Sequence, residues 1–143
     1  MDKKILLAVD DSLQSKYAVK YAVAISSTVK DLHYVLFHVQ PVISHYLLDE
    51  AQKSLKAKAE LDKVIQKNDA SAREILEQYK NDMVRMGIEE NRIEIVTQPR
   101  TLGLAKDIID FGQVGRYDAI VVGSRKMSRL QQVFMGSVSA NLL

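Results

Sequence analysis

Cysteine is absent from the 143 residues of this chain. Disulfide bonds, and metal or redox sites built on thiolates, are therefore excluded. Long apolar runs are missing near the start, since the run at residues 5–9 is far too short for a signal peptide or a membrane span. Together these absences favour a cytoplasmic protein with no membrane partner.

Excess charge of one sign is missing as well. The 20 Lys and Arg residues nearly balance the 18 Asp and Glu residues, which gives a formal net charge of +2, and acidic residues interrupt the lysine-rich stretch near residues 53–67. A nucleic-acid partner is therefore not expected. No nucleophile stands beside a histidine and an acid in a recognisable motif, and the three histidines lack the spacing of metal ligands. The sequence thus favours a binding module over an enzyme.

What the chain does contain is an alternation of short apolar runs and longer helical patterns. The strand-like runs are rich in Ile, Val and Leu, and they fall at residues 4–9, 32–39, 92–97 and 117–122. Runs with so little polar alternation are typical of strands buried on both faces of a parallel sheet. With 47% hydrophobic and 27% charged residues, the composition suits a globular domain. We therefore predict a single α/β domain over residues 1–143, with a doubly wound parallel sheet.

The connections between these runs differ in length. Residues 12–28 and 102–111 carry apolar side chains at helical spacing, with Asp11 or Ser12 capping the first helix and Thr101 the second. The connection over residues 41–87 is far longer than a crossover requires. Within it, residues 72–86 form a strong helical stripe, which a capping-box pattern beginning at Ser71 would start. Residues 47–67 predict an additional helix or a mobile arm.

The C-terminal part combines glycines with basic residues. Gly123 follows the last strand-like run, Arg125 and Lys126 come next, and Gly136-Ser137-Val138-Ser139 has the pattern of a helix start. The free N–H groups at such a start, with cationic side chains nearby, attract phosphate. A polyphosphate cradle is one interpretation of this pattern. The other is that both glycines only form turns.

The turn after the first strand offers a rival interpretation. Paired acids such as Asp10 and Asp11 also occur in response-regulator receivers, where they hold Mg²⁺. A receiver needs a phosphoacceptor aspartate at the end of its third strand, and neither residues 36–40 nor residues 93–97 end on one. A Walker P-loop is absent too, because no Gly-Lys-Ser/Thr follows a strand. Asp10 has the better claim to a ligand because it ends the strand, whereas Asp11 is better explained as a helix cap.

These motifs together resemble the universal stress protein family. The family pattern of Gly, two residues, Gly, nine residues and Gly-Ser/Thr is matched by Gly123 and Gly136-Ser137, with Lys126 in place of the middle glycine. Residues 3–12 and 36–39 are similar to the family's first strand, with its acidic-serine turn, and to its second strand. The resemblance covers the full length of the chain.

The resemblance implies a five-stranded parallel sheet in the order 3-2-1-4-5, paired into a dimer through the fifth strand. It also implies an adenine-nucleotide site. Asp10 would contact the ribose, with Mg²⁺ near it when ATP is bound, and the Val39 backbone would contact adenine in a base pocket lined by Ala8 and Val9. Val122 would also belong to the nucleotide site. The phosphates would be held by the residues around the two glycines, namely Gly123, Arg125, Lys126, Gly136, Ser137, Val138 and Ser139.

Two departures from the family pattern affect these expectations. Lysine at position 126 would be strained by roughly 1 kcal/mol or more if the position needs a positive φ, or it would offer an ammonium group to the phosphates. The fifth strand is missing, so either the chain is truncated after Leu143 or a partner contributes the strand. If nothing follows Leu143 in this chain, the edge at residues 117–122 is unpaired within it and is a template for pairing with another chain, so we expect a homodimer or larger homo-oligomer.

The function predicted from the sequence is an ATP-binding regulatory module of the stress response, with ADP or AMP as related ligands and at most slow ATP hydrolysis. The alternative is a nucleotide-free dimeric interaction module of the same fold. Lys126 is the residue that separates the two hypotheses.

Overall fold

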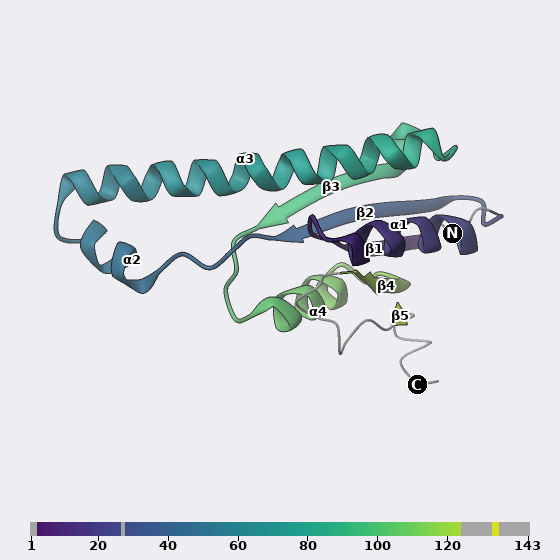
Figure 1. Cartoon of the computed structure of the whole chain (residues 1–143). Coiled ribbons are helices and arrows are strands. Elements are labelled where there is room, and N and C mark those ends of the chain that lie inside the picture. The colour runs from purple at the N-terminus through teal and green to yellow at the C-terminus, as the bar shows by residue number, and fades with distance from the viewer. Residues whose placement is uncertain (1–2, 27, 124–132, 135–143) are drawn as a thin grey trace.

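The computed structural model shows a parallel sheet with helices packed on both faces (Figure 1). It describes residues 3–26, 28–123 and 133–134. The parallel strands are β1 (Lys3–Ala8), β2 (Leu32–Val39), β3 (Ile93–Gln98) and β4 (Ala119–Val122). They lie in the order β3-β2-β1-β4, which confirms the predicted doubly wound sheet.

The helices cover the two faces of the sheet unequally. They are α1 (Leu13–Ser26), α2 (His45–Ala51), α3 (Leu55–Arg85) and α4 (Leu104–Val114), with a 3-10 turn, η1 (Glu90–Arg92), before β3. Helices α1 and α3 pack on one face through side chains such as Val19 and Leu76. Helix α4 packs on the other face, where the Phe111 ring stacks on Phe37 with ring centroids 4.2 Å apart. None of the described helices combines the length and the apolar character that a membrane crossing needs.

The central strands are buried on both sides, which explains their uniform apolar sequences. Leu7 belongs to the cluster that contains α1 and α3, whereas the neighbouring Leu6 belongs to the cluster that contains α4. Both side chains are almost fully buried. Because successive side chains of a strand point to opposite faces, a strand covered by helices on both faces needs apolar residues at every position.

Helix α3 is longer than the sequence pattern predicts. It begins at Leu55, where the Ser54 Oγ accepts a 3.0 Å hydrogen bond from the Ala57 N–H, and it runs without a break to Arg85. The expected start at Ser71 is therefore wrong, because Ser71 lies inside the helix. Residues 55–70 contain no Gly or Pro and are rich in Lys and Ala, so nothing ends the helix there. The first half of α3 extends beyond the sheet, with α2 beside its tip (Figure 1).

The edge of the sheet at β4 is not bare. A short strand, β5 (Val133–Phe134), pairs antiparallel with it, with Ile120 opposite Phe134 and Val121 opposite Val133. The expectation that the chain lacks a fifth strand, and that this edge is unpaired, is therefore wrong at these two positions. The pairing strand is only two residues long and runs antiparallel, so the alternation of parallel strands and helices that guided the prediction does not reveal it.

Candidate functional site

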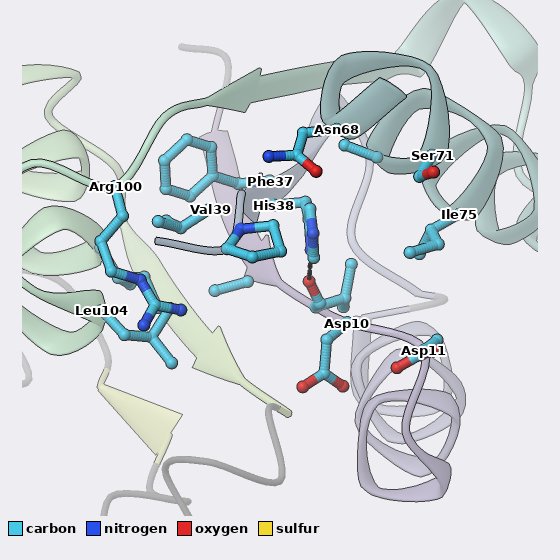
Figure 2. Close-up of a pocket in the computed structure, with 15 residues that line it drawn as sticks. Asp10, Asp11, Phe37, His38, Val39, Asn68, Ser71, Ile75, Arg100 and Leu104 are labelled. Carbon is cyan, nitrogen blue, oxygen red and sulfur yellow. Dashed lines mark hydrogen bonds between the residues drawn. The ribbon is translucent and has the colours of Figure 1, made fainter. Parts of the chain in front are cut away.

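A pocket of about 280 Å³ opens at the carboxyl ends of β1 and β2, between α3 and α4 (Figure 2). Ligands of doubly wound sheets bind at this edge, and the volume is close to the lower end of the usual range for small-molecule sites. Both strands and both helices contribute apolar walls. The polar and charged lining residues are Asp10, Asp11, His38, Asn68, Ser71 and Arg100.

Four of the residues predicted for a nucleotide site line this pocket, namely Ala8, Val9, Asp10 and Val39. Val122 and Gly123 lie one strand away. Val122 pairs with Ala8, and the Gly123 N–H donates a 3.0 Å hydrogen bond to the Ala8 carbonyl. The remaining predicted residues lie outside the described part of the chain; they are Arg125, Lys126, Gly136, Ser137, Val138 and Ser139.

Asp10 is held in place by the start of α1 and by α3. Its Oδ1 accepts a 2.9 Å hydrogen bond from the Ser12 N–H and lies 2.9 Å from the Ser15 hydroxyl. The Tyr79 hydroxyl, on α3, donates to the Asp10 carbonyl at 2.6 Å. These contacts fix the residue before any ligand arrives, so its carboxylate loses little conformational entropy on binding one.

The environment of the Tyr79 hydroxyl, which donates to the Asp10 carbonyl, can be measured through the pKa of Tyr79. Burial, together with the nearby Asp10 charge, raises the pKa of Tyr79 from 10.0 to about 12. A pKa that is higher in the folded than in the unfolded chain contributes stability below pH 10, and this contribution is lost as the pH rises through 12.

We therefore expect Tyr79→Phe to lower the free energy of unfolding by about 1 kcal/mol at neutral pH, because the Asp10 carbonyl loses its donor. The variant should also lose less stability than the wild type between pH 10 and pH 12. Urea unfolding at a series of pH values measures both effects. Parallel alkaline profiles for the two proteins would contradict the assignment of this titration to Tyr79.

His38 links the ends of the two central strands. Its Nδ1 lies 2.8 Å from the Val9 carbonyl oxygen (Figure 2). A carbonyl oxygen only accepts, so Nδ1 carries the proton, and in the neutral ring Nε2 is left as an acceptor. The described residues contain no group of three or more His, Cys, Asp or Glu side chains that would hold a metal ion.

Three polar lining residues are not indicated by the sequence patterns. Asn68 and Ser71 project from the middle of α3, and Arg100 follows β3. The position of Arg100 directly after a strand is the one signal that could have indicated it, because the carboxyl ends of parallel strands meet at the same edge. Asn68 and Ser71 carry no such signal, since only the packing of α3 brings them to the pocket.

The segment that carries Arg100 is fixed by a buried carboxylate. Asp107, only 3% exposed, accepts hydrogen bonds from the Thr101 N–H (2.8 Å), the Thr101 hydroxyl (2.7 Å) and the Leu102 N–H (3.0 Å). Burial alone would raise the pKa of Asp107, but these hydrogen bonds stabilise the carboxylate and hold its pKa below the usual value. Thr101 is therefore not the N-cap of α4 as expected; that position is Gly103.

Gly123 packs against α1. A Cβ built on it would lie 2.7 Å from the Ala18 Cβ and 2.7 Å from the Ser15 Cα, so no side chain fits between the end of β4 and the helix. The Gly123 carbonyl oxygen also lies 2.8 Å from the Ser15 hydroxyl. Close packing thus accounts for a glycine at this position without any ligand.

Comparison with known proteins agrees with this architecture. The model of the universal stress protein family matches residues 1–143. The chain belongs to this family. A universal stress protein from Mycolicibacterium smegmatis is 29% identical over 140 residues, which make up 97% of this chain and 44% of that protein. The chain thus spans less than half the length of that relative.

Solved structures of universal stress proteins share the fold at low sequence identity. UspA from Lactobacillus plantarum is 18% identical with a TM-score of 0.61, covering 98% of this chain and 89% of that one. A family protein from Burkholderia pseudomallei is 15% identical with a TM-score of 0.60, covering 90% and 86%. One from Arabidopsis thaliana with AMP bound is 22% identical with a TM-score of 0.53, covering 86% and 77%.

The pocket of this universal stress protein offers complementary groups on opposite walls. Asp10 and Asp11 lie on the side of α1, and Arg100 lies across from them on the side of α4 (Figure 2). The apolar side chains of Val39, Ile75 and Leu104 also line the pocket. A ligand that fits such a site combines a flat or apolar body with hydrogen-bond donors for a carboxylate and acceptors for a guanidinium.

Proposed function

We propose that this protein is an ATP-binding regulatory module of the stress response that works in the cytoplasm. The meeting of Ala8, Val9, Asp10 and Val39 at one pocket carries the proposal. Membership of the universal stress protein family supports it, and the AMP bound to the Arabidopsis neighbour supports an adenine nucleotide as the ligand.

In the proposed complex the adenine ring lies against Ala8 and Val9 and is hydrogen-bonded by the Val39 backbone. The Asp10 carboxylate accepts hydrogen bonds from the ribose hydroxyls, and such charge-assisted bonds are stronger than neutral ones. Arg125, Lys126 and the backbone of residues 136–139 bind the phosphates, and Mg²⁺ enters with ATP near Asp10. ADP and AMP bind the same site with fewer phosphate contacts.

The proposal is tested on protein purified without added nucleotide. We expect denatured protein to release ATP or ADP, identified by chromatography and mass spectrometry. We also expect calorimetric titration of the emptied protein with Mg-ATP to show one site per chain, with GTP binding more weakly. A protein that releases no nucleotide and gives no heat with Mg-ATP would overturn the proposal.

Lys126 makes a separate prediction about the phosphates. If its ammonium group faces them, Lys126→Ala should weaken binding of ATP more than binding of adenosine, and the difference should narrow at high salt because screening weakens the attraction. We expect this result from calorimetry at two salt concentrations. Tighter ATP binding by Lys126→Gly would mean instead that lysine strains the loop.

The second candidate function is a nucleotide-free dimeric interaction module. The projecting arm formed by α2 and the first half of α3 favours it (Figure 1), because Tyr46 is 75% exposed and Leu55 is 87% exposed there. Large apolar side chains exposed on a projecting element would be buried by packing against a second copy of the chain. Light scattering over a concentration series measures this assembly, and a strict monomer at high micromolar concentration would contradict it.

A further inference from the structure

Arg100 lines the pocket and carries an unsatisfied hydrogen-bond donor. It lies between β3 and α4, and its side chain lines the cavity beside Leu104 (Figure 2). The Nε atom is buried and has no hydrogen-bond partner among the described residues. Buried polar atoms of folded proteins are nearly always paired, so an orphaned donor on a cavity wall indicates a group that is supplied from outside.

The positive charge of Arg100 is also not neutralised within the described part of the chain, where no carboxylate lies within ion-pair distance of it. The first acid that follows Arg100 in sequence, Asp107, already accepts hydrogen bonds from the Thr101 and Leu102 N–H groups. An arginine does not lose its proton in a protein. The guanidinium therefore stays charged in the pocket and favours an anion as its partner.

The location of Arg100 is set by the fold. The Asp107 carboxylate accepts three hydrogen bonds of 2.7–3.0 Å from Thr101 and Leu102, the two residues that follow Arg100. The loop is therefore ordered before a ligand binds. Arg100 faces the pocket from the α4 side, opposite Asp10 and Asp11 (Figure 2). A ligand whose ribose is held at Asp10 can thus reach the guanidinium with another part of the same molecule.

We propose that Arg100 binds a phosphate group of the ligand through its guanidinium group. This inference rests on the proposed nucleotide function, and it adds a phosphate-binding residue outside the glycine motif of the C-terminal part. Guanidinium groups match phosphate oxygens in a bidentate geometry, which a lysine cannot reproduce. Arg100 then discriminates nucleotides from nucleosides, because adenosine offers it no anion.

Calorimetric titration of wild type, Arg100→Gln and Arg100→Lys with ATP, AMP, adenosine and pyrophosphate tests this. We expect Arg100→Gln to lower the affinity for ATP at least tenfold and the affinity for adenosine less than twofold. Arg100→Lys should recover only part of the affinity for ATP. Arg85→Gln is the matched control, since it makes the same charge change on an exposed part of α3, where Arg85 pairs with Asp82. This control should bind ATP like the wild type, and circular dichroism checks that each variant is folded.

The probes separate failure of the inference from failure of the proposed function. Two outcomes would refute the phosphate contact while the nucleotide function stands. In the first, Arg100→Gln binds ATP as well as the wild type does. In the second, Arg100→Gln loses as much affinity for adenosine as for ATP. If wild type binds pyrophosphate in an Arg100-dependent way but binds neither ATP nor adenosine, the site takes a free phosphate anion and the nucleotide function is refuted. Binding of none of the probes refutes both.

Discussion

Gly123→Ala is expected to destabilise the fold by about 1–3 kcal/mol. The new methyl group would lie 2.7 Å from the Ser15 Cα and 3.2 Å from the Gln14 carbonyl oxygen, and both are backbone atoms at the start of α1. Backbone atoms cannot rotate away as a side chain can, so either β4 or α1 must shift. Thermal and urea unfolding measure the loss. Because Ser15 also contacts Asp10, the shift should extend to the pocket.

Gly112→Ala is the matched control. Its Cβ would meet mainly the end of the Ile120 side chain, at 2.3 Å from Cδ1, and this end can rotate. Gly112 lies inside α4, where alanine is favoured over glycine by about 1 kcal/mol. We therefore expect Gly112→Ala to change the free energy of unfolding by less than about 1 kcal/mol. If Gly123→Ala were as mild as this control, β4 and α1 would not be as closely packed as the structure shows.

Ser71→Trp is expected to abolish ATP binding while leaving the fold intact. Ser71 is an exposed residue in the middle of α3, yet it also lines the pocket. An indole at this position would fill much of a cavity of about 280 Å³. Because the helix surface tolerates large side chains, the effect should fall on binding rather than on stability, with a loss of affinity of at least a hundredfold in calorimetry.

Two variants on the same helix separate the effect of added side-chain volume from the effect of losing the Ser71 hydroxyl. Ser71→Ala removes the hydroxyl without adding volume, and we expect ATP affinity within a few-fold of the wild type. Gln78→Trp places the same indole on an exposed position two turns further along α3, outside the pocket lining. It should bind ATP normally. Wild-type affinity in Ser71→Trp would mean that the ligand does not occupy this pocket.

The sheet could be predicted from the sequence because its central strands are covered on both faces. The sequence of β2 is almost uniformly apolar, which distinguishes it from the patterns of a helix or a surface strand. Its predicted bounds match the observed Leu32–Val39. Helix α3 was harder because the capping-box pattern at Ser71 is a local signal. The intrinsic helix preference of residues 55–70 continues the helix through it.

The candidate site could be predicted only where its residues follow a strand in sequence. Val39 ends β2 and Asp10 lies two residues after the end of β1, so the parallel sheet brings them to one edge. Asn68 and Ser71 reach the same pocket from a long helix, and the spacing of polar residues on that helix does not distinguish a pocket wall from a solvated face. For Gly123 the sequence left two interpretations open, part of a phosphate cradle or a turn, and the structure shows the residue packed against α1.

The most direct test of a nucleotide bound at the ends of β1 and β2 is to titrate isotope-labelled protein with Mg-ATP and follow its backbone amide resonances. The proposal predicts saturable shifts concentrated at residues 8–11, 38–40 and 98–104, the segments that carry Asp10, Val39 and Arg100 to the pocket. Absence of shifts at millimolar Mg-ATP, or shifts confined to a distant surface such as residues 89–93, would contradict it.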